Sequence, residues 1–225
     1  MRTIFFKNKP CIISTASVGG PKESSGGIKD YLKIKLSDDM YGESTFEKAE
    51  SRILYASINQ TIIDSKIDEN KIGAIISGDL LNQIIASTFS ARNFKAAYLG
   101  VYNACSTFTE ALTIGATFVN ANHLNNVICA TSSHFSSAER QYRYPLELGS
   151  TRPPLSQWTV TGSGACMLAK SGSNVKITAA TLGRIIDYGV VDVNNMGAAM
   201  APAAADTIIT HFQETGLSPS DYDLI

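Results

Sequence analysis

Cys105 stands in a setting that could give a cysteine nucleophilic chemistry. The thiol follows the apolar segment AAYLGVYNA and precedes a run of small and apolar residues that reaches about Asn120. A strand joined directly to a helix would hold this side chain beside free amides and the positive end of a helix dipole, which favour a thiolate and can stabilise an oxyanion. The alternative is a structural cysteine buried in the core, which is the commoner position of an unpaired cysteine.

The rest of the chain offers Cys105 no evident catalytic partner. Three further cysteines fall inside strand-like segments without CxxC spacing: Cys11, Cys129 and Cys166. We expect them to be buried and reduced, with no metal site. His123 lies in a polar turn and is expected to be solvated, whereas His211 lies in an amphipathic segment that suits a surface or core helix. Acyl transfer by a cysteine needs a base that activates the thiol, and neither histidine is placed to provide it.

Polar residues follow three successive predicted strands and predict a small pocket. The carboxyl ends of parallel strands share one edge of a sheet, which is where open α/β sheets bind ligands. The candidates at this edge are Asp79, Asn82, Cys105, Ser106, Ser132, Ser133 and His134. Each has a structural alternative: Asp79 as a cap of the following helix, the two serines as strand ends, and His134 as a hydrogen-bonded loop residue.

A basic and aromatic segment follows these strand ends. Arg140 and Arg143 alternate with Tyr142 and Tyr144. The two guanidinium groups could bind carboxylates of a ligand. Surface ion pairs or contacts between subunits explain the same pattern equally well.

Hydrophobic periodicity predicts alternating strands and helices. Leu54, Ile58 and Ile62 recur at four-residue intervals, which indicates a helix that ends near Ser65. We expect Ser44 and Glu47 to form a capping box at its start. The other expected helices cover residues 80–94, 106–120 and 198–215, and the expected strands lie within 11–20, 71–80, 96–104, 125–134, 159–170 and 175–186. Residues 135–158 are expected to be a loop, and the alternation predicts an α/β protein with a parallel or mixed sheet.

Composition argues against several functional classes. The 225 residues carry 19 Lys and Arg against 20 Asp and Glu, so the net charge is -1 and there is no basic footprint for nucleic acid. No apolar run approaches the roughly 20 residues that span a bilayer, and the first residues lack the apolar core of a signal peptide. We therefore expect a protein on the cytoplasmic side of any membrane.

The order of these motifs resembles the thiolase superfamily. GDLLNQ, NACST, ATSSH and TGSGA occur in that order, and ATSSHFSSAERQYRYP with MGAAMAPAAADTI is similar to a family of sporulation proteins within the superfamily. The resemblance covers essentially the whole chain. It implies a layered αβαβα fold built from two duplicated halves, with residues 1–172 as the first half and residues 173–225 as the start of an incomplete second half. It also places Cys105 at the position of the thiolase nucleophile.

The resemblance to the sporulation family implies a ligand and partners. Proteins of that family bind dipicolinic acid during its movement into the developing spore, at the periphery of the spore inner membrane. They act with membrane-embedded components of the same transport system, and a homodimer formed through the first half is expected. No cofactor is implied. The first hypothesis is a non-catalytic binder of dipicolinic acid, and the second is an acyl-transferring condensing enzyme that uses Cys105.

Overall fold

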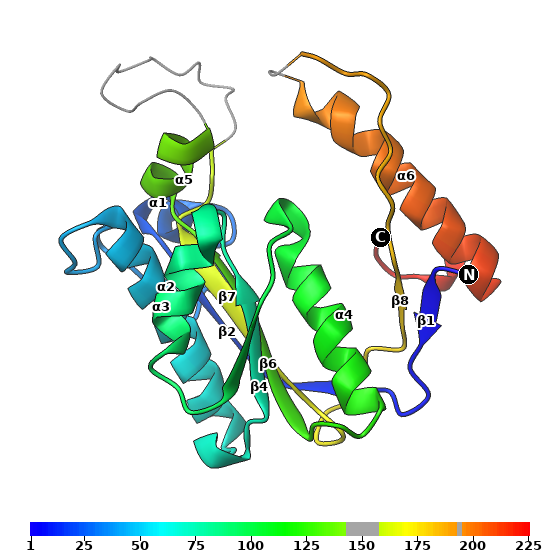
Figure 1. The fold of residues 1–225 in the computed structure, drawn as a ribbon, viewed down its shortest axis with the longest axis horizontal. Coiled ribbons are helices and arrows are strands. Elements are labelled where there is room, and N and C mark those ends of the chain that lie inside the picture. The colour runs from blue at the N-terminus through cyan, green and yellow to red at the C-terminus, as the bar shows by residue number, and fades with distance from the viewer. Residues whose placement is uncertain (143–157, 193–194) are drawn as a thin grey trace. The chain divides into compact units, whose positions relative to one another are not determined.

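The computed structural model describes residues 1–142, 158–192 and 195–225 (Figure 1). These residues form two compact units. The larger unit contains residues 8–176, and the smaller unit combines residues 1–7 with residues 177–225. The division between duplicated halves at residue 172 stays a prediction.

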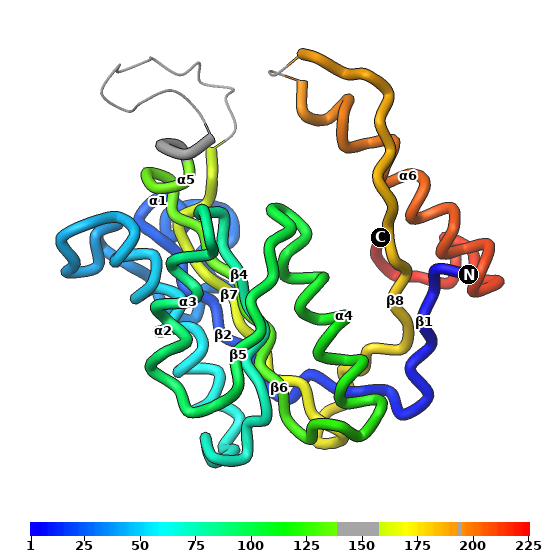
Figure 2. Tube along the Cα trace, viewed as in Figure 1, coloured from blue at the N-terminus to red at the C-terminus, as the bar shows by residue number. Residues whose placement is uncertain are grey.

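A mixed sheet forms the centre of the larger unit, as the sequence predicted. Six strands of the described residues run in the order β3 (Ile34–Lys35), β2 (Cys11–Gly19), β7 (Gly162–Ala169), β6 (Asn126–Ser133), β4 (Ala74–Gly78) and β5 (Ala97–Gly100). β4 is parallel to both β5 and β6, whereas β7 is antiparallel to β2 and β6. β4, β5 and β6 can be followed as neighbours in the trace (Figure 2).

Helices cover both faces of this sheet. α2 (Phe46–Ser65) and α3 (Ile85–Ala91) pack on one face, and α4 (Thr107–Asn120) packs on the other (Figure 1). Two short helices, α1 (Pro21–Ser25) and α5 (Phe135–Tyr142), follow β2 and β6. Single 3-10 turns occur at Lys29–Tyr31, Glu69–Lys71, Asn82–Ile84, Ala104–Ser106 and Pro219–Asp221.

The apolar stripe predicted for α2 forms the main core. Leu54 and Ile58 are fully buried against Ile75 of β4, Ile128 of β6 and Met167 of β7. Because successive strand residues point to opposite faces, alternate residues of β6 and β7 supply this core while their neighbours face α4. Complete burial of side chains of this size stabilises the fold by about 1.5–3 kcal/mol each.

Small residues bring α4 close to the other face of the sheet. A Cβ atom at Gly115 would lie 2.8 Å from the Sγ atom of Cys129. The Cys129 thiol in turn donates to the carbonyl of Ala111 at 3.2 Å. A helix with larger residues at these positions could not approach β6 so closely.

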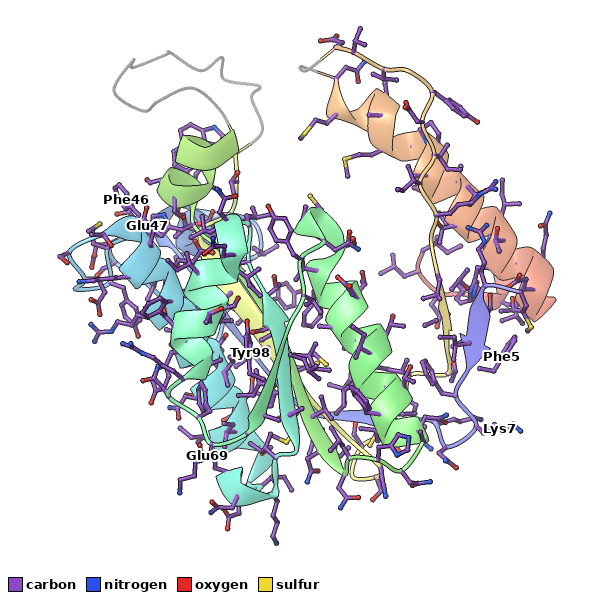
Figure 3. The ribbon with its side chains drawn as sticks, viewed as in Figure 1. Phe5, Lys7, Phe46, Glu47, Glu69 and Tyr98 are labelled. Atoms are coloured by element: carbon purple, nitrogen blue, oxygen red, sulfur yellow. The ribbon has the colours of Figure 1, made fainter. Side chains whose placement is uncertain are left out.

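The start of α2 corrects the predicted capping box. The N-cap is Thr45, whose hydroxyl accepts from the backbone N–H of Lys48 at 3.3 Å, so the helix begins one residue later than a Ser44 cap would give. Ser44 and Thr45 are both good caps, and the sequence alone did not distinguish them. Phe46 and Glu47 form the first turn (Figure 3).

Two further expectations about helices were wrong. The helix predicted for residues 80–94 is reduced to a 3-10 turn followed by α3, because Gln83 and Ile84 adopt left-handed backbone conformations with φ of 58° and 45°. The loop predicted from residue 135 begins with helix α5. Its sequence FSSAERQY contains Ala, Glu, Arg and Gln, which are good helix formers and favour this helix over a loop.

The smaller unit has its own sheet and helix. β1 (Thr3–Phe5) pairs antiparallel with β8 (Ala179–Thr181), and α6 (Met196–Thr215) follows. The carboxylate of Glu214 accepts from the backbone N–H groups of Arg2 and Thr3 at 2.8 and 2.6 Å. These hydrogen bonds join the start of β1 to the C-terminal end of α6. The Arg2 guanidinium lies 2.8 Å from the Asp206 carboxylate and adds an ion pair to this junction.

Candidate functional site

The carboxyl ends of β4, β5 and β6 lie at the same edge of the sheet, as the sequence predicted. Ser77 of β4 pairs with Gly100 of β5, and Gly78 pairs with Thr131 of β6. The hydroxyl of Thr131 also donates to the carbonyl of Gly78 at 3.0 Å. The loops that follow these strands, which we call the strand-end edge, therefore begin side by side.

The Cys105 turn is a short, closed structure at this edge. The backbone N–H of Asn103 donates to the Thr107 hydroxyl at 3.1 Å, and the Ser106 hydroxyl donates back to the Asn103 carbonyl at 2.9 Å. Ala104 has a φ of 44°, a left-handed conformation that costs about 1 kcal/mol or more for a residue with a Cβ atom. Cys105 itself is exposed. The structure thus supports the predicted strand-turn-helix setting and excludes a buried thiol.

Gly78 allows this turn to lie against β4. A Cβ atom at residue 78 would lie 1.9 Å from the backbone carbonyl oxygen of Val101 and 2.8 Å from the Thr107 methyl group. The N–H of Val101 donates to the carbonyl of Ser77 at 3.0 Å. Only a glycine at position 78 permits this approach.

The sheet separates the predicted site residues into two groups. Ser133 and Thr131 lie on the face of β6 that α4 covers, whereas Ser132 lies on the opposite face, toward α2. The Ser133 hydroxyl donates to the carbonyl of Val160 at 2.5 Å. Cys105 and Ser106, which directly precede α4, therefore lie toward the same side as Ser133, whereas Ser132 faces Glu50 of α2 on the other side.

Asp79 caps the first turn of α3, which is one of the two roles that the sequence suggested for it. The backbone N–H groups of Leu81 and Ser87 donate to its two carboxylate oxygens at 2.8 and 2.7 Å, and Ser87 lies in the first turn of α3. Burial nevertheless raises the pKa of Asp79, and these backbone hydrogen bonds only oppose the rise. The neighbouring Asn82 is exposed in the 3-10 turn before α3.

His134 is a fully buried and hydrogen-bonded residue. Its Nδ1 atom accepts from the backbone N–H of Ser136 at 3.2 Å, so its Nε2 atom carries the proton that it donates to the carbonyl of Asp39 at 2.8 Å. The ring also packs against Phe46, with 5.2 Å between the ring centroids. The structural interpretation of His134 therefore holds. Arg143 and the side chain of Arg140 lie outside the described residues.

Glu50 is the residue that sequence reasoning missed. It lies on α2 with no exposed surface, and its carboxylate oxygens accept from the hydroxyls of Ser132 at 3.1 Å and Ser137 at 2.8 Å. Burial, and then the charge of Asp79, raise the pKa of Glu50 to about 8. A signal was available, because Glu50 precedes Leu54 by four residues and so extends the apolar stripe of α2.

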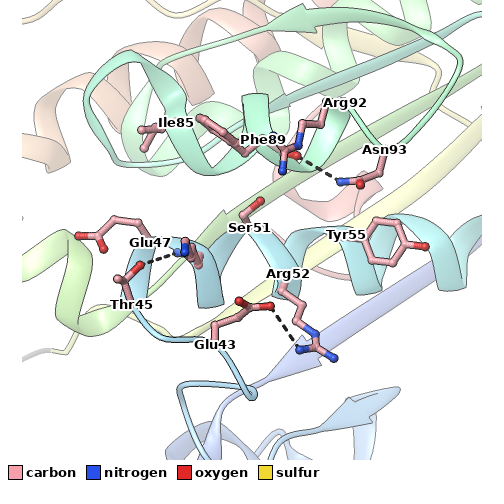
Figure 4. Close-up of a pocket in the computed structure, with 11 residues that line it drawn as sticks. Glu43, Thr45, Glu47, Ser51, Arg52, Tyr55, Ile85, Phe89, Arg92 and Asn93 are labelled. Atoms are coloured by element: carbon pink, nitrogen blue, oxygen red, sulfur yellow. Dashed lines mark hydrogen bonds and ion pairs between the residues drawn. The ribbon is translucent and has the colours of Figure 1, made fainter.

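A groove lies elsewhere on the larger unit, between α2 and α3 (Figure 4). Its volume is about 640 Å³, and its lining includes Lys48, Arg52, Tyr55, Phe89 and Arg92. Arg52 is engaged with Glu43 at 3.3 Å. No residue predicted for the strand-end edge is among the described residues that line this groove, so it provides a spatially separate control surface.

The three other cysteines and His211 have defined surroundings, and His123 is exposed, as predicted. Cys11, Cys129 and Cys166 are buried in strands, as predicted. His211 is held through both ring nitrogens by Thr181 and Tyr222, at 2.7 and 2.6 Å.

Over the same residues, no three His, Cys, Asp or Glu side chains cluster as metal ligands would. None of the helices described combines the length and apolar character that a membrane crossing requires.

Comparison with known proteins now decides the family. Residues 1–225 match the family described as stage V sporulation protein AD. All 225 residues of this chain align with the Stage V sporulation protein AD of Bacillus subtilis at 36% identity. The chain belongs to the stage V sporulation protein AD family. It spans 66% of the length of the Bacillus subtilis relative, which is slightly less than two thirds.

Solved structures confirm that this family member has a thiolase-like fold. A variant of OleA from Xanthomonas campestris matches with a TM-score of 0.67 at 18% identity, over 98% of this chain and 77% of its own. The 3-oxoacyl-(acyl carrier protein) synthase III of Xanthomonas oryzae matches with a TM-score of 0.62 at 15% identity, over 98% and 77%. At such identities the likeness establishes the fold alone.

Proposed function

We propose that this member of the stage V sporulation protein AD family binds dipicolinic acid at the strand-end edge and does not catalyse acyl transfer. The observation that carries the proposal is the family match over all 225 residues, together with an exposed Cys105 turn. The ligand is a flat ring with two carboxylates, which suits a shallow site with small residues and backbone donors. In the cell the protein would deliver this ligand to membrane-embedded partners at the spore inner membrane.

The positions of the three histidines support a binding role. His134 is fully occupied by hydrogen bonds, and His211 is held by Thr181 and Tyr222 within the smaller unit. His123 follows the C-terminal end of α4, while Cys105 precedes its N-terminal end. A helix of 14 residues is about 21 Å long, which is far beyond proton-transfer distance.

Titration calorimetry of the full-length protein with dipicolinic acid tests the proposal directly. We expect saturable binding, weakened at least about ten-fold by Cys105→Trp, because the indole would fill the space above the turn. Arg92→Glu in the groove between α2 and α3 is the matched control and should leave the affinity unchanged. An absence of binding at millimolar ligand would exclude the function, and loss of binding only in Arg92→Glu would move the site to the groove.

One observation favours a second candidate function, acyl transfer. Cys105 is exposed, and the residue before it, Ala104, has a left-handed backbone conformation of the kind found at functional sites. One solved OleA variant with the same fold is bound with cerulenin. An enzyme with Cys105 as nucleophile would carry one acyl or cerulenin adduct per chain.

Mass spectrometry after incubation with cerulenin or an acyl-CoA separates the two functions. We expect no stoichiometric adduct, because His134 and His211 are held through both ring nitrogens and His123 lies beyond the far end of α4. Full labelling that Cys105→Ser abolishes would instead establish the enzyme. Iodoacetamide, which needs no oxyanion site, serves as the control for an accessible thiol.

A further inference from the structure

A pair of buried carboxyl groups lies beneath the strand-end edge. Glu50 has no exposed surface and Asp79 has 1%. Among the described residues, the carboxylate of Glu50 accepts from two hydroxyl groups, those of Ser132 and Ser137, and has no lysine or arginine partner. A buried carboxyl group without a cation is expensive to ionise.

The charged and titratable groups around Glu50 do not relieve this cost. Asp79, at the end of β4, and Glu47, on the same helix, both disfavour the charged form. His134 lies between β6 and α5 and is linked to Glu50 through the Ser137 hydroxyl, which lies 2.8 Å from Glu50 and 3.2 Å from the His134 carbonyl. Its neutral ring is occupied at both nitrogens, so it provides no positive charge.

Both carboxyl groups are linked to the strand-end edge, Glu50 through the Ser132 hydroxyl and Asp79 through its own position directly after β4. Ser132, which donates to Glu50, is the neighbour of Ser133 on the Cys105 side of β6. Asp79 follows Gly78, whose Cα lies against the Val101 carbonyl and the Thr107 side chain. The charge of either acid would thus act on an anion at the Cys105 turn through protein rather than through water, where electrostatic interactions are stronger.

We propose that Glu50 is a positioning residue that must be protonated for a dianionic ligand to bind at the strand-end edge. The inference rests on the proposed function, because it concerns dipicolinate at that edge. A neutral Glu50 leaves Ser132 in place and adds no negative charge beneath the ligand. An ionised Glu50 must be neutralised by a proton from solvent when the dianion binds, so the carboxylate and the proton form one O–H bond and no other group changes.

The acid–base properties of the pair agree with this geometry. The pKa of Glu50 is raised to about 8, and that of Asp79 is also raised by burial. Near neutral pH Glu50 is mainly protonated, and it loses its proton as the pH passes 8. Dipicolinate stays a dianion over this range because ordinary carboxyl groups ionise near pH 4. Its affinity should therefore fall as the pH rises.

Calorimetry with dipicolinate between pH 6.5 and 9.5 tests the inference on the full-length protein. For the natural sequence we expect the affinity to fall on the order of ten-fold over this range, with uptake of a fraction of a proton above pH 8, measured in buffers of different ionisation enthalpy. Glu50→Gln should bind with little pH dependence. Glu43→Gln, which changes a carboxylate engaged with Arg52, should retain the slope.

The outcomes separate this inference from the function on which it rests. If dipicolinate binds the natural sequence at no pH, the proposed function fails. If it binds with a flat profile and no proton uptake, or if Glu50→Gln keeps the slope, only the role of Glu50 fails. Should Glu50→Gln not fold, proton uptake by the natural sequence still decides the question.

Discussion

Replacing Glu50 by glutamine should stabilise the protein at alkaline pH, by about 4–5 kcal/mol at pH 8 and above. Glu50 is fully buried, and its pKa is raised from 4.5 to about 8. The folded state therefore holds a proton that the unfolded state has released. The free energy of unfolding therefore has its full contribution from protonated Glu50 below pH 4.5. This contribution falls progressively as the pH rises from 4.5 to about 8.

Glutamine has the same shape and cannot ionise, so it should remove this loss. Its amide oxygen can accept from one of the two serines, Ser132 or Ser137, and its NH₂ group can donate to the other. Urea unfolding at intervals between pH 5 and 9 would measure the effect. We expect the stability of the natural protein to fall by up to about 1.4 kcal/mol per pH unit more steeply than that of Glu50→Gln.

Glu43→Gln is the control for the loss of a carboxylate that is partly exposed rather than buried. Glu43 forms an exposed ion pair with Arg52, so its replacement should change stability by less than about 1 kcal/mol. A Glu50→Gln variant that is less stable than the natural protein at pH 8 would contradict the prediction. It would show that the folded protein favours the charged carboxylate.

Replacing Gly78 by alanine should destabilise the larger unit by about 2–4 kcal/mol or prevent folding. The added Cβ atom would lie 1.9 Å from the Val101 carbonyl oxygen, which belongs to the backbone and cannot rotate away. Either β4 or the segment that leads to Cys105 must move. Thermal unfolding followed by circular dichroism measures the loss, and a Gly78→Ala variant as stable as the natural protein would contradict it.

Gly164→Ala provides a matched glycine in the same sheet. Gly164 lies on β7, and a Cβ atom there would meet nothing within 4 Å. Because alanine restricts the unfolded chain more than glycine does, this variant should be as stable as the natural protein or slightly more stable. A similar loss in both variants would show that the strain at Gly78 is not specific.

The sequence predicted most of the elements because their signals were local. The four-residue recurrence of Leu54, Ile58 and Ile62 located α2 to its last residue, Ser65. The strand that leads to Cys105 and the helix that follows were predicted because a short apolar run ended at small polar residues. Boundaries that depend on one hydrogen bond, such as the Thr45 cap, were off by a residue.

The candidate site was harder to predict, because side-chain direction depends on the tertiary structure. Ser132 and Ser133 were placed in one pocket, yet neighbouring residues of a strand point to opposite faces of the sheet. The role of Asp79 depended on whether the N–H of Ser87 would fold back to it, eight residues away. Glu50 was overlooked because a lone acid in an apolar stripe shows its importance only once Ser132 and Ser137 surround it.

The contact at Gly78 also couples the Cys105 turn to α3 mechanically. Val101 cannot move toward β4, because its carbonyl already lies against Gly78. Asp79 directly follows that glycine, and its carboxylate accepts from the N–H of Ser87 in the first turn of α3. A displacement of the Cys105 turn would therefore reach α3 through the backbone at Gly78 and the buried Asp79 carboxylate. A ligand that moved the Cys105 turn on one face of the sheet would in this way also shift the first turn of α3 on the opposite face.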